Sequence, residues 1–198
     1  MASIDQLEPN PRSFRSIEEN VGLNALHNVA AHRLALGADA GTRSLTYPAG
    51  EPGRGTLSGD AAAELRRQHG STIRTATIPI DTLDHFVATH EQPDPAFVKI
   101  DVEGFECDVL EGMAATMARC RPDLFVELYG VTEADKVRCT RCVLAFVRPF
   151  GYSVIHVESG RPVADSASFM PLTGHLYATP SADRADAAAR VLTPILPS

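Results

Sequence analysis

The 198-residue sequence has no tryptophan and only four cysteines. It also lacks any run of about 18 consecutive apolar residues, the length that a membrane helix needs. The N-terminal residues MASIDQLEPNP lack the basic stretch and apolar stretch of a signal peptide. We therefore expect a cytoplasmic protein without a membrane span. The net charge of −7 argues against nucleic-acid binding, because that needs a basic surface.

Several catalytic and metal-binding patterns are also missing. There is no G-x-S-x-G serine motif and no phosphate-binding G-x-x-x-x-G-K loop. The seven histidines show no metal-binding spacing and are expected to be structural, with another role left open for His175. Cys139 and Cys142 form a single C-x-x-C pair, whereas a structural zinc site usually needs two such pairs. We expect reduced thiols and no metal, with a zinc or redox pair as the alternative.

Apolar residues make up 44% of the sequence, enough for the core of one domain. Helical and extended patterns alternate, which indicates an α/β sandwich with a mostly parallel sheet. Residues 152–157 and 175–179 are expected to close it as an antiparallel pair. We expect a domain over residues 1–180 and a loosely attached tail over 181–198. The other predicted strands are residues 4–7, 29–36, 42–47, 71–80, 97–102 and 124–128. The predicted helices are residues 11–25, 61–69 and three further helices that follow Asp81, Gly104 and Thr132.

Acidic residues follow or end four of the predicted strands: Glu8, Asp39, the pair Asp101 and Glu103, and Glu127. Ligands of parallel sheets bind beyond the carboxyl ends of the strands, so these acids indicate a ligand with hydroxyls, amines or positive charge. Glu8 suits the two hydroxyls of a ribose, or alternatively complements the dipole of the following helix. Asn10 is the predicted cap of that helix.

The position of Asp101 in its strand favours a role in ligand binding. It lies at the end of a strand in which Val98, Ile100 and Val102 alternate with polar residues. A carboxylate there needs partners or solvent, and a binding cleft supplies either. The alternative is a salt bridge between Lys99 and a neighbouring acid.

The segment FVKIDVEGFECDVLEGM, residues 97–113, closely resembles the signature of the FkbM family of methyltransferases. LEPNP, NVGLNAL, ALGADAG, TIPIDTLD, PDLFVELYG and HLYATP resemble further family segments in the same order, so that the resemblance spans residues 7–180. It implies a Rossmann-like class I fold and methyl transfer from S-adenosylmethionine to a hydroxyl of a sugar, glycolipid or polyketide-type small molecule. The expected partner is this acceptor, and a homo-oligomer is left open.

The resemblance also implies roles for the acids. Glu8 would bind the ribose of the cofactor, and Asp39 would lie near its adenine. Asn10 and Asp101 would also be among the residues that bind the cofactor. Asp101 would line the reaction cleft together with Glu103. Asp101 is the first candidate for orienting the acceptor hydroxyl or taking its proton, and Glu127 is the second. Nothing in the spacing of these acids demands a metal.

One family feature is missing. Family members carry a strand, a glycine-rich turn and a helix before the position of LEPNP, but here six residues without glycine precede Leu7. In the class I order that strand is central, between the strands that end at Glu8 and Asp101. We therefore expect an N-terminally truncated domain that binds S-adenosylmethionine poorly unless another chain completes the sheet. The alternatives are an inactive remnant, a partner subunit of a methyltransferase, or a binding module for another nucleoside.

Overall fold

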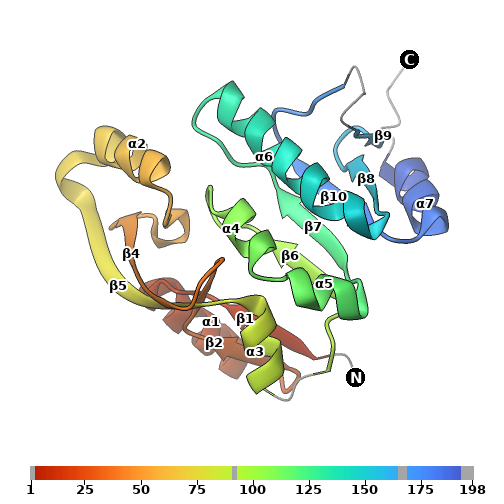
Figure 1. Cartoon of the computed structure of the whole chain (residues 1–198). Helices are drawn as coiled ribbons and strands as arrows, with labels where there is room; N and C mark the ends of the chain where they lie inside the picture. Colours follow the sequence, from red (N-terminus) through yellow and green to blue (C-terminus); the bar gives the residue numbers. More distant parts are fainter. Residues whose placement is uncertain (1–2, 91–92, 165–168, 193–198) are drawn as a thin grey trace.

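Strands and helices alternate along the chain and form three sheets in the computed structural model, which describes residues 3–90, 93–164 and 169–192 (Figure 1). The strands are β1 (Ile4–Leu7), β2 (Val29–His32), β3 (Ala35–Leu36), β4 (Gly41–Pro48), β5 (Ile73–Asp81), β6 (Phe97–Ile100), β7 (Asp123–Glu127), β8 (Ser153–His156), β9 (Arg161–Pro162) and β10 (His175–Thr179). The helices are α1 (Pro11–Leu23), α2 (Gly59–His69), α3 (Leu83–Thr89), α4 (Glu106–Glu111), α5 (Ala114–Cys120), α6 (Glu133–Val147) and α7 (Ala182–Leu192). Short 3-10 turns lie at Pro52–Arg54, Gly70–Thr72 and Arg148–Phe150.

The two larger sheets are mixed, so the prediction of a mostly parallel sheet is wrong although the α/β class is confirmed. The five-stranded sheet has the order β6-β7-β10-β8-β9, and only β6 and β7 pair in parallel. The predicted antiparallel pairing of residues 152–157 with 175–179 is confirmed as β8–β10. β10 enters between β7 and β8 and runs opposite to both, and β4 and β5 also pair antiparallel. Antiparallel pairs therefore outnumber the parallel pairs β1–β2, β3–β5 and β6–β7 among the described strands.

The main core lies between the five-stranded sheet and α3 to α6. α4, α5 and α6 lie across one face of β6, β7 and β10 (Figure 1). Leu110, Met113 and Met117 from the helix side and Leu124 and Leu176 from the sheet are fully buried there. Val126 and Ala178 of the same two strands, β7 and β10, are also buried, because helices cover this face of the sheet.

The N-terminal strands form a less buried layer. β1 pairs in parallel with β2, and α1 follows β1 with Asn10 as its N-cap and Pro11 as its first residue, as the sequence predicts. No residue of α1 is buried. The neighbouring sheet β3-β5-β4 has its own small core of Ala35, Leu45, Ile78 and Ile80.

Two predicted elements are divided in the structure. Residues 29–36 form two strands, because β2 pairs with β1 and β3 pairs with β5. The helix after Gly104 is divided into α4 and α5 at Gly112. A Cβ at Gly112 would lie 2.0 Å from the carbonyl oxygen of Gly37, so only glycine permits this close approach of the two segments.

The segment after Ser181 is not a loosely attached tail over residues 182–192. These residues form α7, which lies beside β8 (Figure 1). Ala185 is buried, and Arg184 forms an ion pair with Asp123 at 3.2 Å. Residues 193–198 of the predicted tail lie outside the described part, and the domain boundary at residue 180 stays a prediction.

The expectation of four reduced thiols is also wrong. Cys107 of α4 and Cys142 of α6 are joined by a disulfide, with their Cα atoms 6.1 Å apart, and Cys120 and Cys139 are free. The two cysteines are 35 positions apart, which hides this pairing in the sequence. It arises because α4 and α6 pack side by side. No helix in the described ranges is long and apolar enough to cross a membrane.

Candidate active site

A cavity of about 940 Å³ lies between β1 and β6, with β3, α3 and the loop at residues 52–57 around it. This volume is near the upper end of the roughly 300–1,000 Å³ typical of ligand sites. Four of the predicted site residues line it: Glu8, Asn10, Asp101 and Glu103. They come from the carboxyl ends of β1 and β6. The structure thus brings together acids that are about ninety residues apart in the sequence, at the sheet edge where ligands bind.

Glu8 is held in place by Asn10. The backbone N–H of Asn10 donates to Oε1 of Glu8 at 2.7 Å. Burial raises the pKa of Glu8, and the negative charge of Asp101 raises it further, while the Asn10 hydrogen bond lowers it. The side chain of Asn10 is buried and already used, because it accepts from Arg12 N–H and donates to the carbonyl of Pro52. Asn10 therefore positions Glu8 and the start of α1.

The turn after β6 has an unusual backbone. Glu103 has a φ of +52° and Gly104 a φ of +96°, both in the left-handed region. A left-handed non-glycine residue costs about 1–3 kcal/mol and needs support from its surroundings. The buried Thr56 supplies it, since its hydroxyl donates to the carbonyl oxygen of Glu103 at 2.6 Å. This turn aims the Glu103 side chain into the cavity, where burial and nearby Asp101 raise the pKa of its carboxyl.

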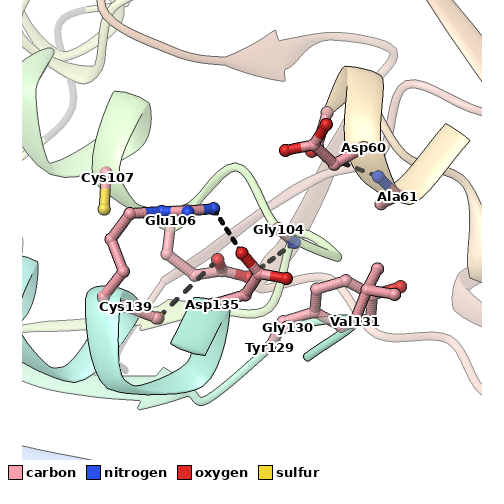
Figure 2. A pocket seen from close by; sticks show the side chains of 12 residues that line it. Asp60, Ala61, Gly104, Glu106, Cys107, Tyr129, Gly130, Val131, Asp135 and Cys139 are labelled. Atoms are coloured by element: carbon pink, nitrogen blue, oxygen red, sulfur yellow. Dashed lines mark hydrogen bonds and ion pairs between the residues drawn. The ribbon is translucent and has the colours of Figure 1, made fainter. Parts of the chain in front are cut away.

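The same turn is also held by residues that line a second, smaller pocket between α2, α4 and α6 (Figure 2). Glu106 is buried at the start of α4 and accepts the backbone N–H of Gly104 at 3.0 Å. Cys139 of α6 faces the same carboxylate at 3.9 Å. Burial raises the pKa of Glu106 and raises that of the Cys139 thiol to about 12, so this thiol stays protonated near neutral pH. We assign Glu106 a structural part in holding the turn.

Asp101 and Glu127 form a carboxyl pair at the ends of the neighbouring strands β6 and β7. Two carboxyls can hydrogen-bond only when one of them carries a proton. This interaction and burial raise the pKa of Glu127 to about 7, so that Glu127 can gain or lose a proton near neutral pH. Burial alone would raise the pKa of Asp101, but the hydrogen bonds from Glu127 and Lys99 lower it. Lys99 Nζ lies 2.8 Å from Asp101 Oδ2, which is the salt bridge that the sequence offered as the alternative. Asp101 therefore forms this salt bridge and lines the cavity at the same time.

His175 stands directly opposite Glu127 in the β7–β10 ladder. Its Nδ1 lies 2.6 Å from Oε1 of Glu158, and its backbone N–H donates to Oε2 of the same carboxylate at 2.9 Å. Burial alone would raise the pKa of Glu158, but these bonds lower it. The charge of a protonated His175 lowers the pKa of both Asp101 and Glu127, so His175 is part of their electrostatic environment.

Asp39 and Glu127 are the two predicted site residues that do not line the cavity; Glu127 joins the site through its pairing with Asp101, whereas Asp39 lies apart. Asp39 is exposed in the bend after β3, so its contact with adenine stays a prediction. The sequence analysis missed Thr56 and Glu158. Thr56 supports Glu103, which lies 47 residues later, and Glu158 supports His175, which lies 17 residues later. No local pattern could have revealed them. Within the described ranges, no three or more His, Cys, Asp or Glu side chains are grouped to hold a metal ion.

Known proteins resemble the chain in sequence and in fold. It is 31% identical over 112 residues to a hexuronic acid methyltransferase, AglP, from Haloferax volcanii, covering 57% of this chain and 41% of that protein. It is 26% identical over 122 residues to Methyltransferase 1 from Beauveria bassiana, covering 57% of this chain and 49% of that protein. The chain thus spans about half the length, or less, of these curated relatives.

The crystal structure of the methyltransferase FkbM from Methylobacillus flagellatus KT matches 89% of this chain and 36% of its own, with a TM-score of 0.54 and 14% identity. At this identity the match shows the fold alone. The family model of the methyltransferase FkbM domain matches residues 5–154. The resemblance carried by residues 97–113 is therefore confirmed, and the chain belongs to the FkbM methyltransferase family.

Proposed function

We propose that the cavity binds S-adenosylmethionine and that the chain takes part in moving its methyl group to a hydroxyl of a sugar, glycolipid or polyketide-type small molecule. The observation that carries the proposal is the meeting of Glu8, Asp101 and Glu103 in one cavity at the carboxyl ends of β1 and β6. When bound, this cofactor supplies a methyl group already activated by a positively charged sulfur.

The side chains around the cavity suit this cofactor. Glu8 has one carboxylate oxygen occupied by the N–H of Asn10, which leaves the other free to accept from ribose hydroxyls. Asp101 and Glu103 add negative charge, which favours a cationic ligand over an anionic one. The Thr56 and Glu106 contacts hold the turn that carries these acids, so little ordering remains to be done on binding.

Glu127 is the best candidate to accept the proton that the acceptor hydroxyl loses. A general base works best when its pKa is near the working pH, and the pKa of Glu127 is about 7. Asp101, whose pKa is lowered, stays ionised and acts as the partner that raises the proton affinity of Glu127. Asp101 lines the cavity and Glu127 does not, so Asp101 orients the acceptor hydroxyl and relays its proton to Glu127.

A relative and two segments of the chain bear on the identity of the acceptor. One relative is named a hexuronic acid methyltransferase, which supports a sugar as the acceptor. The sequence predicts that residues 48–59 and 158–173 influence acceptor choice. Pro52, Gly53, Gly55 and Leu57 of the first segment line the cavity. Residues 165–168 of the second lie outside the described part.

Photocrosslinking of radiolabelled S-adenosylmethionine tests the cofactor part, because it detects weak binding. We expect label on peptides that contain Glu8 or residues 101–103, competition by unlabelled S-adenosylhomocysteine, and less label in Glu8→Gln. Glu19→Gln is a matched control, since Glu19 is an exposed residue of α1 outside the cavity. Label that excess competitor does not reduce, or that is equal in Glu8→Gln and wild type, would contradict the proposal.

A further inference from the structure

A row of titratable side chains crosses three neighbouring strands beside the cavity. The sheet order β6-β7-β10 places Glu127 of β7 between Asp101, which follows β6, and His175 of β10. Asp101 lines the cavity, and Glu158 contacts His175 on the side away from β7. The side chains of His175 and Glu158 are 31% and 44% accessible, so the row leads from the cavity to the solvent.

His175 faces Glu127 across the β7–β10 ladder. The N–H of Leu128 donates to the carbonyl of Gly174. The N–H of His175 points away from β7 and donates to Glu158. His175 and Glu127 are therefore a non-hydrogen-bonded pair, in which the Cα atoms lie about 4.5 Å apart and the side chains point to the same face of the sheet. The His175 ring thus stands within reach of the Glu127 carboxyl, directly or through one water.

Glu158 fixes which ring nitrogen of His175 carries the proton. Burial raises the pKa of Glu158, but the hydrogen bonds from His175 lower it below the ordinary value of 4.5, so Glu158 is a carboxylate near neutral pH. A carboxylate can only accept, so Nδ1 of His175, which lies 2.6 Å from Oε1 of Glu158, carries a hydrogen. In neutral His175 the other ring nitrogen, Nε2, then has a lone pair that can accept a proton.

The surrounding residues hold Glu158 in this position. Nε2 of His156 lies 2.8 Å from the carbonyl of Thr173 and therefore carries a hydrogen, because a carbonyl can only accept. The same nitrogen lies 3.1 Å from Oε2 of Glu158. Gly174 has a φ of +87°, and a Cβ at this position would collide with the Glu158 carboxylate. Only glycine therefore lets this carboxylate lie against the backbone next to His175.

Glu127 has neighbours with opposite effects on its proton. Asp101 raises the pKa of Glu127, which favours uptake of a proton from the cavity side. A protonated His175 lowers the pKa of Glu127, which favours release of the proton on the other side. The charged and titratable groups around Glu127 and His175 are Lys99, Asp101, Glu103, His156 and Glu158.

We propose that this row is a proton outlet: Nε2 of His175 takes the proton from Glu127 and gives it to water, and Glu158 positions His175 for this transfer. This inference rests on the proposed function, in which the proton of the acceptor hydroxyl reaches Glu127 through Asp101. In the outlet step the O–H bond of Glu127 breaks and an N–H bond forms at Nε2. The resulting imidazolium lies between two carboxylates, at Glu127 and Glu158, which stabilise its charge. Loss of the Nε2 proton to water restores neutral His175.

The position of the hydrogen on His175 in the wild-type protein is the first test. Long-range ¹⁵N NMR of labelled histidine at high pH, where histidines are neutral, shows which ring nitrogen carries the hydrogen. We expect it on Nδ1 of His175. The exposed His27 is the control, because a neutral imidazole in water mainly carries its hydrogen on Nε2. A hydrogen on Nε2 of neutral His175 would overturn the proposal, since this nitrogen could not then accept a proton.

The second test is the titration of Glu127, followed by carbon-detected NMR. In His175→Gln the positive neighbour is lost, so the pKa of Glu127 should rise from about 7 by about one unit or more. His27→Gln, a change at an exposed histidine, should leave it unchanged. Glu158→Gln keeps the shape of the side chain but weakens the positive charge on His175, so it should also raise the pKa of Glu127.

A double variant shows whether Glu158 acts through His175. Glu158→Gln should no longer raise the pKa of Glu127 once His175→Gln is present. An equal rise in both backgrounds, or an unchanged pKa of Glu127 in His175→Gln, would overturn the proposal. If His175→Gln does not fold by circular dichroism, the ¹⁵N measurement on the wild type decides. None of these measurements involves S-adenosylmethionine, so they can fail while labelling of the cavity succeeds, which would leave the proposed cofactor site standing without the outlet.

Discussion

The strands of the five-stranded sheet and those of the N-terminal sheet differ in how they are supported. β7 and β10 have a neighbour on each edge and helices over one face, and Leu124 of β7 has no accessible surface. β1 has one neighbour, and the helix that follows it buries no residue and leaves Leu23 84% accessible. The candidate site lies where these two regions meet. Asp101 and Glu103 follow a strand of the well-packed sheet, whereas Glu8 follows a strand of the less buried one.

The largest expected effect tests this difference in packing. Leu124→Ala creates a cavity in the core between β7 and the helices, so the free energy of unfolding should fall by about 2–5 kcal/mol. Leu23→Ala makes the same change on the exposed face of α1 and should alter it by no more than about 0.5 kcal/mol. Urea denaturation measures both values. Similar losses for the two variants would mean that the regions are equally packed.

The second prediction concerns the carboxyl pair at the boundary between the regions. The pKa of Glu127 is about 7 chiefly because of Asp101, so Glu127 should be mostly protonated below pH 7 and ionised above it. In Asp101→Asn the negative neighbour is gone, and the pKa of Glu127 should fall towards its ordinary value of 4.5. Carbon-detected NMR titration of labelled glutamate measures it. Asp39→Asn is the control, and a Glu127 pKa that is unchanged in Asp101→Asn would contradict the pairing.

The third prediction concerns the turn that presents Glu103. Gly104→Ala places a side chain at a φ of +96°, with its Cβ 3.0 Å from Tyr129 Cδ1. We expect a loss of stability of about 1–3 kcal/mol. Gly59→Ala at the start of α2 meets no atom within 4 Å and should be neutral or slightly stabilising. Thermal unfolding compares the two variants, and equal melting temperatures would show that the turn adapts without strain.

The smallest expected effect concerns the attachment of α7 to the five-stranded sheet. Arg184→Ala removes the ion pair that links α7 to Asp123 of β7, and its side chain is largely exposed. Such pairs contribute about 1 kcal/mol or less, so we expect a small rise in proteolysis within α7. Arg190→Ala, an exposed change on the same helix, should have no effect. Equal cleavage in both variants would indicate that Ala185 and its apolar neighbours, rather than the ion pair, attach α7.

Local sequence determined the family, most of the secondary structure and four of the residues that meet in the cavity. Alternating patterns predicted the strands, and Asn10-Pro11 predicted the start of α1, because these signals depend on neighbouring residues. Acids that follow parallel strands converge wherever such strands lie together, so Glu8, Asp101 and Glu103 could be found without the structure. Asp39 followed the same rule and does not line the cavity: Ala35 and Leu36 of β3 do, but Asp39 lies in the exposed bend beyond this strand.

Only the tertiary structure decided the sheet order, the Cys107–Cys142 disulfide, the supporting contacts of Thr56 and Glu158, and the pKa of Glu127. Each depends on contacts between residues far apart in the chain, which no local pattern records. The space between β1 and β6 also depends on contacts between distant residues. The sequence specifies two strands with the right polarity, but whether they pair with each other or leave a space between them depends on how the sheets pack.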